Sequence, residues 1–469
     1  MPKKIGRLEF VMENMTAVKL AAMIGGKLIH GDPARVVTHI SIDSREVDHD
    51  ALFVPLKGER VDAHRFLADV ANQKAACVLC SEEITPSGDA AWIQVKDTYE
   101  SLVRIGVSWR DCMDLKVVAV TGSVGKTTTR EMVATALSAG YRTFRTAKNY
   151  NSDIGVPIML SLLSSKDEAA VLELGMSDFG EMEKIARMTR PDVAVITNIG
   201  VAHIAQLKTR ENICSEKLSV TKGMLPGSLL ILNGDDDLLS NVDESIGYQI
   251  LFYGLGKHND YRAENVVFEE ECTSFDAICP GGKVSVKLPV TGTHMVMNAL
   301  AALAVAEHFG IERAVAAKAL SEFKAFSGRQ QIYPVGNFKV IDDTYNASPD
   351  SMRAALGVLT SLPCNGRRIA VLSNMLELGE NEQLYHRQVG AFAGDLAIDE
   401  MICVGDLAEQ IGKAASEKNS SLTVSYFSAN EEAASYLKKH ISTGDLLLFK
   451  GSNSTRIGQI INQLKEEFA

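Results

Sequence analysis

A Gly-Lys-Thr triplet at residues 125–127 carries the clearest chemical signal in the sequence. It lies in the stretch TGSVGKTT, residues 121–128, between an apolar β-branched run and a segment with helical spacing. Strand, glycine-rich turn and helix start, in that order, direct free backbone N–H groups and the helix dipole at an anion. Lys126 can then reach the terminal phosphates, and the hydroxyl of Thr127 or Thr128 can ligate Mg²⁺. The stretch predicts a nucleotide phosphate-binding loop, with an ordinary strand–helix turn as the alternative.

This loop departs from the usual phosphate-loop spacing at one position. The usual pattern has a glycine five positions before the final glycine, and Val120 occupies that position here. Gly122 and Gly125 still give the backbone the freedom to close around phosphate oxygens. The sequence therefore predicts a variant loop of the form TGSxGKTT.

Other polar residues follow apolar runs of the kind found in buried strands. Glu173 lies in AAVLEL (169–174), and Asn198 and His203 lie in and after DVAVITNI (192–199). Parallel strands place their carboxyl ends at one edge of a sheet, where ligands of open α/β sheets bind. We therefore expect these side chains to lie on the same side as the phosphate loop.

The elements that must position these residues predict an α/β fold with three domains, as the chain length also suggests. Residues 1–112 read as a small α/β domain, 113–325 as a central P-loop domain with a parallel sheet, and 326–469 as a doubly wound, Rossmann-like domain. Short alternating strands in 261–289 are expected as an antiparallel addition to the central sheet. Strands are expected at 39–42, 52–55, 76–80, 169–174, 192–199, 229–232, 339–341, 368–372, 401–404 and 446–449, and helices at 20–24, 66–74, 212–220 and 298–309.

Composition excludes several classes of function. The formal net charge of the 469 residues is −11, which disfavours a general affinity for nucleic acid or anionic membranes. No signal-peptide pattern and no apolar run of about 18 residues is present, so we expect no membrane span and a cytoplasmic location. The eight cysteines read as structural thiols in a reducing compartment, with a metal or redox role for the Cys77–Cys80 pair as the alternative.

Several motifs, in order along nearly the whole chain, resemble the ATP-dependent Mur ligases of peptidoglycan synthesis and their folylpolyglutamate synthetase relatives. They are TGSVGKTT at 121–128, LELGM at 172–176, TNIGVAHI at 197–204, NALAA at 298–302 and SGR at 327–329. Residues 43–66 resemble the family's UDP-binding domain. The stretches 149–157, 175–182, 342–352 and 375–380 resemble most closely the branch that joins D-Ala-D-Ala to UDP-N-acetylmuramoyl-tripeptide.

The resemblance implies an ATP-dependent carboxylate–amine ligase with Mg²⁺ as its metal. ATP would phosphorylate the carboxylate to an acyl phosphate, and the amine would then displace phosphate. A free carboxylate has no adequate leaving group at neutral pH, and the charge of the phosphates and of the oxyanion must be offset by cations. The implied substrates are UDP-N-acetylmuramoyl-tripeptide and D-Ala-D-Ala, handled by a monomer.

The resemblance also assigns roles to single residues, and we state them as expectations. ATP phosphates would be held by Gly122, Ser123, Val124, Gly125, Lys126, Thr127, Thr128 and Arg329, adenine by Asn298 and ribose by Asp343. Metal ligation would fall to Thr127, Glu173, His203 and an N-carbamylated Lys217, and catalysis to Lys126, Lys217, Glu173 and His203. Substrate would be contacted by Ser44 and Arg45 at the UDP end, by Asn149 and Asn151 at the peptide end, and by Tyr345 and Asn346.

Alternatives stay open at this point. From the residues alone, Lys217 reads as a surface lysine paired with Glu216 or Glu211, and the family spacing favours the carbamylated lysine instead. Asp43-Ser44-Arg45 could also be a simple turn. Within the family, the chain could add the third peptide residue or act on folates. Outside it, the chain could be a nucleotide-driven switch without ligase chemistry. ATP hydrolysis that requires both a carboxylate and an amine separates these classes.

Overall fold

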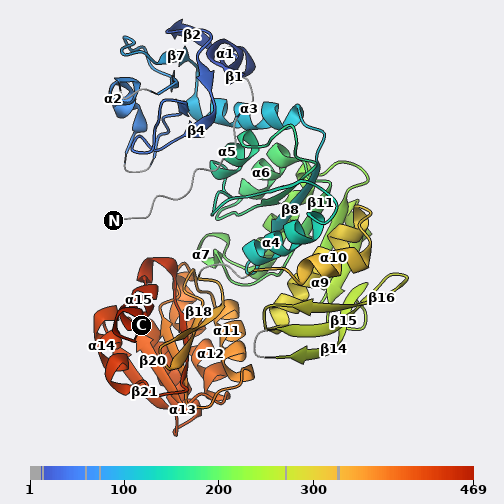
Figure 1. The fold of residues 1–469 in the computed structure, drawn as a ribbon, viewed down its shortest axis with the longest axis vertical. Coiled ribbons are helices and arrows are strands. Elements are labelled where there is room, and N and C mark those ends of the chain that lie inside the picture. Colours follow the sequence, from blue (N-terminus) through green and yellow to red (C-terminus); the bar gives the residue numbers. More distant parts are fainter. Residues whose placement is uncertain are drawn as a thin grey trace.

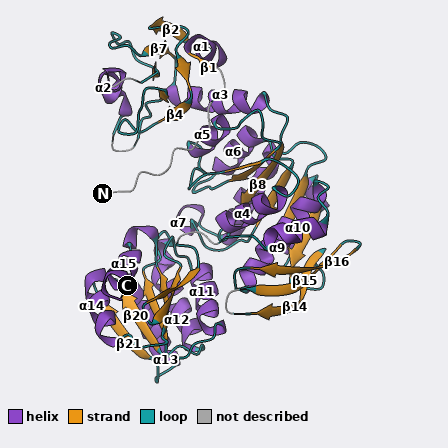
Figure 2. Cartoon of the chain, viewed as in Figure 1, coloured by secondary structure: helices purple, strands orange, loops and turns teal. Residues whose placement is uncertain are grey.

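Three sheets follow one another along the chain, and we call the parts that carry them the N-terminal, central and C-terminal units. The computed structural model describes residues 12, 15–58, 61–72, 75–269, 272–324 and 328–468. In Figure 1 the units run from blue through green and yellow to red, with helices against the faces of the two larger sheets (Figure 2). The predicted mixed α/β fold with parallel sheets is confirmed. Residue 327, the first residue of the SGR motif at 327–329, lies outside the described residues.

The N-terminal unit holds a five-stranded sheet in the order β2-β7-β6-β5-β4. Strands β4 to β7 are parallel, and β2 joins β7 in the antiparallel direction. A separate antiparallel pair, β1 and β3, lies beside it. The elements are β1 Met15–Thr16, α1 Ala17–Ile24, β2 Lys27–His30, β3 Val36–Val37, β4 His39–Ser41, β5 Ala51–Phe53, α2 Leu67–Asn72, β6 Cys77–Cys80 and β7 Ala91–Gln94.

The central unit holds a nine-stranded sheet in the order β16-β15-β14-β13-β12-β11-β8-β10-β9. Strands β8 to β14 are parallel, and β15 and β16 add the predicted antiparallel edge. The strands are β8 Lys116–Thr121, β9 Thr143–Arg145, β10 Ala169–Glu173, β11 Val193–Ile196, β12 Leu229–Asn233, β13 Gln249–Gly254, β14 Tyr261–Phe268, β15 Thr273–Cys279 and β16 Gly282–Leu288. The helices are α4 Lys126–Leu137, α5 Gly155–Ser161, α6 Glu181–Thr189, α7 Ile204–Leu207, α8 Arg210–Leu218, α9 Thr293–His308 and α10 Arg313–Leu320.

The phosphate-loop strand lies in the middle of this sheet. Val117 to Val120 are completely buried, because β8 has strands on both sides and helices over both faces. On one face α4 packs against the alanine-rich α9, whose small side chains let the two helices approach closely. The loop that follows β8 is therefore held on a rigid support.

The C-terminal unit holds a six-stranded sheet in the order β17-β18-β22-β19-β20-β21. All neighbours are parallel except β17, which pairs with β18 in the antiparallel direction. The strands are β17 Gln331–Val335, β18 Phe338–Asp342, β19 Arg368–Ser373, β20 Glu400–Val404, β21 Thr423–Phe427 and β22 Leu446–Lys450. The helices are α11 Pro349–Ser361, α12 Glu382–Gly394, α13 Ala408–Lys418, α14 Asn430–His440 and α15 Gly458–Phe468.

Helix α3, Thr98–Asp111, was not among the expected elements. The Asp97 carboxylate caps it by accepting from the Glu100 N–H at 2.8 Å. Its far end packs on α5 of the central unit (Figure 1). There Trp109 donates its indole N–H to the Leu163 carbonyl at 2.8 Å. Helix α3 therefore joins the first unit to the second through a buried contact.

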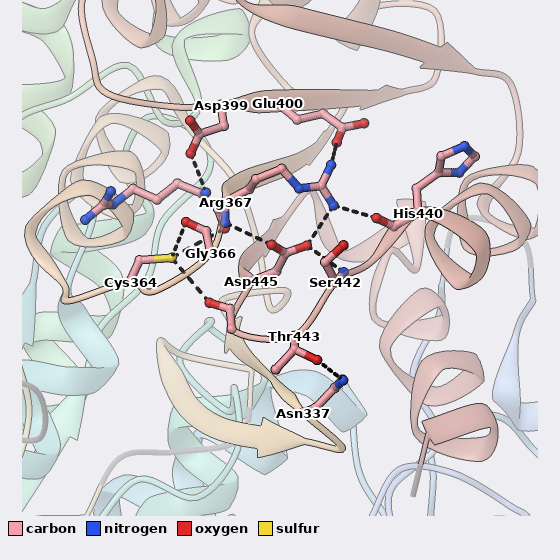
Figure 3. Close-up of polar contacts among 12 residues, drawn as sticks. Asn337, Cys364, Gly366, Arg367, Asp399, Glu400, His440, Ser442, Thr443 and Asp445 are labelled. Carbon is pink, nitrogen blue, oxygen red and sulfur yellow. Dashed lines mark hydrogen bonds and ion pairs between the residues drawn. The ribbon is translucent and has the colours of Figure 1, made fainter.

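A charged network ties together the starts of the C-terminal strands (Figure 3). The Arg367 guanidinium lies 2.9 Å from Glu400 and 2.7 Å from Asp445, and both carboxylates are almost fully buried. Asp445 also accepts from the backbone N–H groups of Arg367 and Ser442 at 2.8 and 2.9 Å. These contacts join the loops before β19, β20 and β22 at the amino ends of the strands.

Within the described residues, no helix combines the length and the apolar character that crossing a membrane requires.

Candidate active site

One cavity of about 720 Å³ lies between the central and C-terminal units. Its walls come from the carboxyl ends of strands in both sheets, as expected for ligand sites of parallel α/β folds. The expected site residues that line it are Ser123, Val124, Gly125, Lys126, Thr127, Thr128, Asn149, Asn151, Glu173, His203, Asn298, Arg329, Asp343, Tyr345 and Asn346. The cavity thus collects most of the residues that the sequence motifs single out.

The phosphate loop is fixed by contacts to the segment after β11. Ser123 N–H donates to the Asn198 carbonyl at 3.0 Å, and Val124 N–H donates to the Asn198 side-chain oxygen at 2.8 Å. Thr197 donates its hydroxyl to the Val124 carbonyl at 2.5 Å. These bonds shape the loop before any ligand arrives.

Gly122 cannot be replaced without moving this segment. Its φ is +144°, and a Cβ built on it would lie 1.8 Å from the Thr197 hydroxyl oxygen. Gly125, with a φ of +86°, is the N-cap of α4 and starts the helix beside the cavity. The two glycines are thus required by close approach in one case and by backbone conformation in the other.

The side-chain amines of Lys126 and Lys217 lie close enough for the charge of Lys126 to affect Lys217. Lys126 curls back and donates to the Gly122 and Ser123 carbonyls at 2.7 and 3.3 Å. Lys217 is only 1% exposed, so the alternative of a surface lysine paired with Glu216 or Glu211 is wrong. Glu216 instead accepts from the Gly180 and Met182 backbone N–H groups.

Burial lowers the pKa of both amines. Burial and the charge of Lys126 hold the pKa of Lys217 well below its usual range. Burial also lowers the pKa of Lys126, against the opposing effect of Glu173. The lowering is the larger one at Lys217, where it favours the unprotonated, nucleophilic amine.

His203 faces the same region from the N-cap of α7. Its φ is +62°, a left-handed conformation that is uncommon outside glycine. Burial, helped by the charges of Lys126 and Lys217, lowers the pKa of His203 to about 4. Its imidazole is therefore neutral at pH 7 and has a nitrogen lone pair available for a metal ion or a proton.

Glu173 is buried, and each of its carboxylate oxygens accepts a hydrogen bond. Arg130 donates to Oε2 at 3.0 Å and Asn151 donates to Oε1 at 2.8 Å. Arg130 also pairs with Glu131, which in turn lies 2.9 Å from Arg145. Each Glu173 oxygen keeps a further lone pair, so the carboxylate remains able to ligate a cation.

The C-terminal wall carries a second charged pair. Lys450, at the end of β22, lies 2.5 Å from the Asp343 carboxylate and donates to the Asn346 carbonyl at 2.9 Å. The Arg329 guanidinium stacks over the Tyr345 ring at 3.9 Å from its centroid. Asp343, Tyr345 and Asn346 are thus placed on one loop by contacts within their own unit.

Asn298, on α9, lines the cavity on the side of the central unit. Its side-chain oxygen accepts from the Thr129 hydroxyl at 2.9 Å. Its side-chain nitrogen is buried and has no hydrogen-bond partner among the described residues. An unused donor at a cavity wall suits an acceptor on a bound ligand, such as a purine nitrogen.

Ser44 and Arg45 lie apart from this cavity, in the N-terminal unit after β4. Arg45 forms hydrogen bonds with both oxygens of Asp43, at 2.8 Å for the closest Nε contact, and they lower the pKa of Asp43 to about 2. Arg45 is 85% exposed, and its role toward UDP stays a prediction. Gly122 and Lys217 also do not line the cavity wall.

Among the described residues, no group of three or more His, Cys, Asp or Glu side chains converges as a metal site. Glu173 and His203 are the two such side chains among the expected ligands. Mg²⁺ in nucleotide enzymes is usually held by one or two carboxylates together with phosphate oxygens and water. The protein donors therefore suit a cation that arrives with a nucleotide rather than a closed protein cage.

Several cavity residues were not expected from the sequence. Lys450 sits at the end of a predicted strand, and Glu377 lies in the motif 375–380, to which no site role was assigned. Arg130 lies behind the wall, four residues after Lys126, and the i, i+4 spacing on α4 was the signal that places it near the loop. A search for polar residues directly after the predicted strands of the C-terminal unit would have identified Lys450.

Comparison with known proteins agrees with this geometry. Three family profiles match: the Mur ligase family catalytic domain at residues 36–105, the Mur ligase middle domain at 120–306 and the Mur ligase glutamate ligase domain at 328–453. A UDP-N-acetylmuramoyl-tripeptide–D-alanyl-D-alanine ligase of Bacillus subtilis is 36% identical over 97% of this chain and 99% of that protein.

Solved structures give the same result. MurF from Acinetobacter baumannii has a TM-score of 0.88 and 32% identity, covering 97% of this chain and 99% of that one. MurF ligase from Thermotoga maritima in complex with ADP has a TM-score of 0.82 and 26% identity, covering 92% and 97%. Full-length identity above 30%, the three matching profiles and the shared architecture establish that this chain belongs to the Mur ligase family.

Proposed function

We propose that this protein is an ATP-dependent ligase that joins D-Ala-D-Ala to UDP-N-acetylmuramoyl-tripeptide. The observation that carries the proposal is the single cavity that combines the phosphate loop, Glu173 and His203 with Arg329 and Asp343. Relatives similar over their whole length carry the name of this ligase. The C-terminal carboxylate of the tripeptide would take the γ-phosphoryl group of ATP, and the D-Ala amine would attack the acyl carbon and release phosphate.

The residues of the chain divide this work. The backbone N–H groups of residues 123–128 and the Lys126 ammonium bind the phosphates, and Arg329 neutralises further phosphate charge from the opposite wall. Asn298 donates to the base, and Asp343 accepts from the ribose hydroxyls. Asn149 and Asn151, beside Glu173, hold the peptide end of the acceptor.

We also propose Mg²⁺ as the metal, held by Thr127, Glu173, His203 and Lys217 as its carbamate. The donors fit because Thr127 and Glu173 offer oxygen and the imidazole of His203 is neutral. Bound Mg²⁺ would supply positive charge against the phosphate and acyl oxygens. An unmodified Lys217 ammonium would oppose that charge, whereas a carbamate would reverse its sign.

The proposal includes a cytoplasmic monomer. All eight cysteines lie within the described residues, and none forms a disulfide. Free thiols, three of which are exposed or half-buried, suit a reducing compartment. Ser44 and Arg45 are proposed to contact the UDP group at the carboxyl end of β4.

The test is ADP release by the purified chain across matched substrates. We expect rapid release with UDP-N-acetylmuramoyl-tripeptide and D-Ala-D-Ala together, and little with either substrate alone, with free D-Ala or with L-glutamate. Acceptors that end in lysine and in diaminopimelate are compared in parallel. Preference for a UDP-dipeptide with a diamino acid, or for folate with glutamate, would overturn the substrate assignment while leaving the family intact. Release that needs no amine would overturn the ligase itself.

A further inference from the structure

Glu377 and His203 face each other across the boundary between the C-terminal and central units. Oε2 of Glu377 lies 3.4 Å from Nδ1 of His203. Both residues have left-handed backbone conformations, with φ of +65° and +62°. Such conformations cost non-glycine residues on the order of 1–3 kcal/mol and persist where the surroundings impose them, often at functional sites. Two such residues meeting at one cavity wall point to a geometry that serves the site.

The loop that presents Glu377 is held firmly by its own unit. The Met375 N–H donates to Nε2 of the fully buried His386 at 2.9 Å. The next residue, Leu376, donates its N–H to the Ser452 hydroxyl at 2.9 Å. These two bonds fix the backbone on the amino side of Glu377, so the carboxylate is presented on a rigid support.

The same loop packs directly on the central unit. Leu378 belongs to the hydrophobic core of the C-terminal unit, and Val201 of the central unit is buried in that same cluster. A Cβ built on Gly379 would lie 3.1 Å from Cα of Ala205 in α7. The backbone that carries Glu377 is therefore part of a packed interface, although the Glu377 side chain itself is 64% exposed.

A carboxylate next to one ring nitrogen affects which nitrogen of the imidazole carries the proton. A neutral imidazole carries one N–H and one lone pair, and a carboxylate beside one nitrogen holds the proton there. Histidines that bind metals usually donate the other ring N–H to such a carboxylate, which orients the ring and strengthens it as a ligand. A carboxylate 3.4 Å from Nδ1 favours a proton on that nitrogen, which would leave the lone pair of His203 on Nε2.

We propose that Glu377 is a positioning residue that orients His203 for the cation, so that the C-terminal unit completes the cation site of the central unit. This inference rests on the proposed role of His203 in metal binding. Because Glu377 and His203 belong to different units, cation affinity and the approach of the two units become thermodynamically linked, and each favours the other. The cation would thus bind most tightly when the two walls of the cavity are together.

Mn²⁺ binding to the full-length protein tests the proposal without measuring turnover. Free Mn²⁺ is followed by electron paramagnetic resonance in the presence of saturating ADP. Glu377→Gln should raise the Mn²⁺ dissociation constant about 10- to 100-fold, the usual effect of losing such a partner. Glu380→Gln is the matched control, since it removes an equal charge from an exposed position three residues away. Its dissociation constant should equal that of the unchanged protein.

A double-mutant cycle separates orientation from general electrostatics. If Glu377 acts through His203, adding Glu377→Gln to His203→Ala should weaken Mn²⁺ binding no further. Weakening of equal size in both backgrounds, or equal dissociation constants for Glu377→Gln and Glu380→Gln, would overturn the inference. Unchanged Mn²⁺ binding in His203→Ala would instead overturn the proposed metal role of His203. Equal thermal midpoints of the two glutamine variants are expected, and a selective loss for Glu377→Gln would assign it a structural role only.

Discussion

The guanidinium of Arg130 lies 3.0 Å from the Glu173 carboxylate, and both side chains are 4% exposed. The pair joins the helix that follows the phosphate loop to the strand end that lines the cavity. Because Arg130 also contacts Glu131, it balances two buried carboxylates at once. The position of the Glu173 carboxylate at the cavity wall therefore depends on a buried arginine that does not line the cavity.

Arg130→Met should destabilise the protein by about 3–5 kcal/mol, since removing one partner leaves buried charge uncompensated. The free energy of unfolding from urea titration measures the change. Arg142→Met is the control, because Arg142 is 61% exposed and lies 3.9 Å from Asp167. A change of less than about 1 kcal/mol is expected there. Equal effects of the two substitutions would contradict the importance of burial.

Lys126→Ala and Thr127→Ala should abolish turnover without unfolding the protein. Loss of a charge contact to the transition state typically costs about 10²–10³ in rate. ADP release gives the rate and circular dichroism the fold. Lys166→Ala, at an exposed position, should leave the rate unchanged. Near-normal turnover in Lys126→Ala would remove the loop from the mechanism.

Lys217→Ala should lose nearly all activity and regain part of it with a short carboxylic acid in solution. The lowered pKa of the Lys217 amine favours the unprotonated form that reacts with CO₂. An added carboxylate would replace the missing carbamate oxygens. Lys222→Ala tests the neighbouring, exposed lysine and should need no rescue. Full turnover of Lys217→Ala without additive would refute carbamylation, and so would mass spectrometry that finds the active enzyme unmodified after trapping.

His386 should make stability depend on pH. Burial lowers its pKa below the ordinary 6.5, and its Nε2 accepts a hydrogen bond only while the ring is neutral. The unfolded chain therefore takes up the proton first as pH falls, so stability is full above pH 6.5 and decreases below it, by at most about 1.4 kcal/mol per pH unit.

Urea titrations of the unchanged protein and of His386→Gln at pH 5 to 8 measure this effect. The variant should be less stable at pH 8, and the difference should shrink toward pH 5. His49→Gln, at a ring that is 60% exposed, should show a small difference at every pH. A stability gap for His386→Gln that is constant with pH would contradict the assignment.

The short apolar strands are the part of the fold that can be predicted well from the local sequence. Runs such as 169–174 and 446–449 are buried along their whole length, so periodicity and composition suffice to find them. Helix α3 was missed although its spacing is amphipathic. The edge strand β17 was not predicted, because its sequence has no strong strand pattern and its formation depends on pairing with β18. The domain boundaries at 112 and 325 stay predictions.

Some residues of the candidate site can likewise be predicted from the local sequence, and others cannot. The phosphate loop and Glu173 follow strands in sequence, so local reasoning finds them. The burial of Lys217 and the contact between Glu377 and His203 arise from segments far apart in the chain, and no local pattern distinguishes them from surface residues. The partners of a catalytic side chain are set by packing, which a single sequence does not display.

The charged network of Arg367, Glu400 and Asp445 lies at the amino ends of β19, β20 and β22, and the carboxyl end of β22 reaches the cavity. Strand β22 follows Asp445 directly and ends at Lys450. The ionic contacts before β22 are therefore a full strand length away from Lys450 at the cavity wall. A substitution at the cavity end of β22 can therefore leave the anchor of the sheet untouched, so this unit can change its part of the cavity wall without losing its fold.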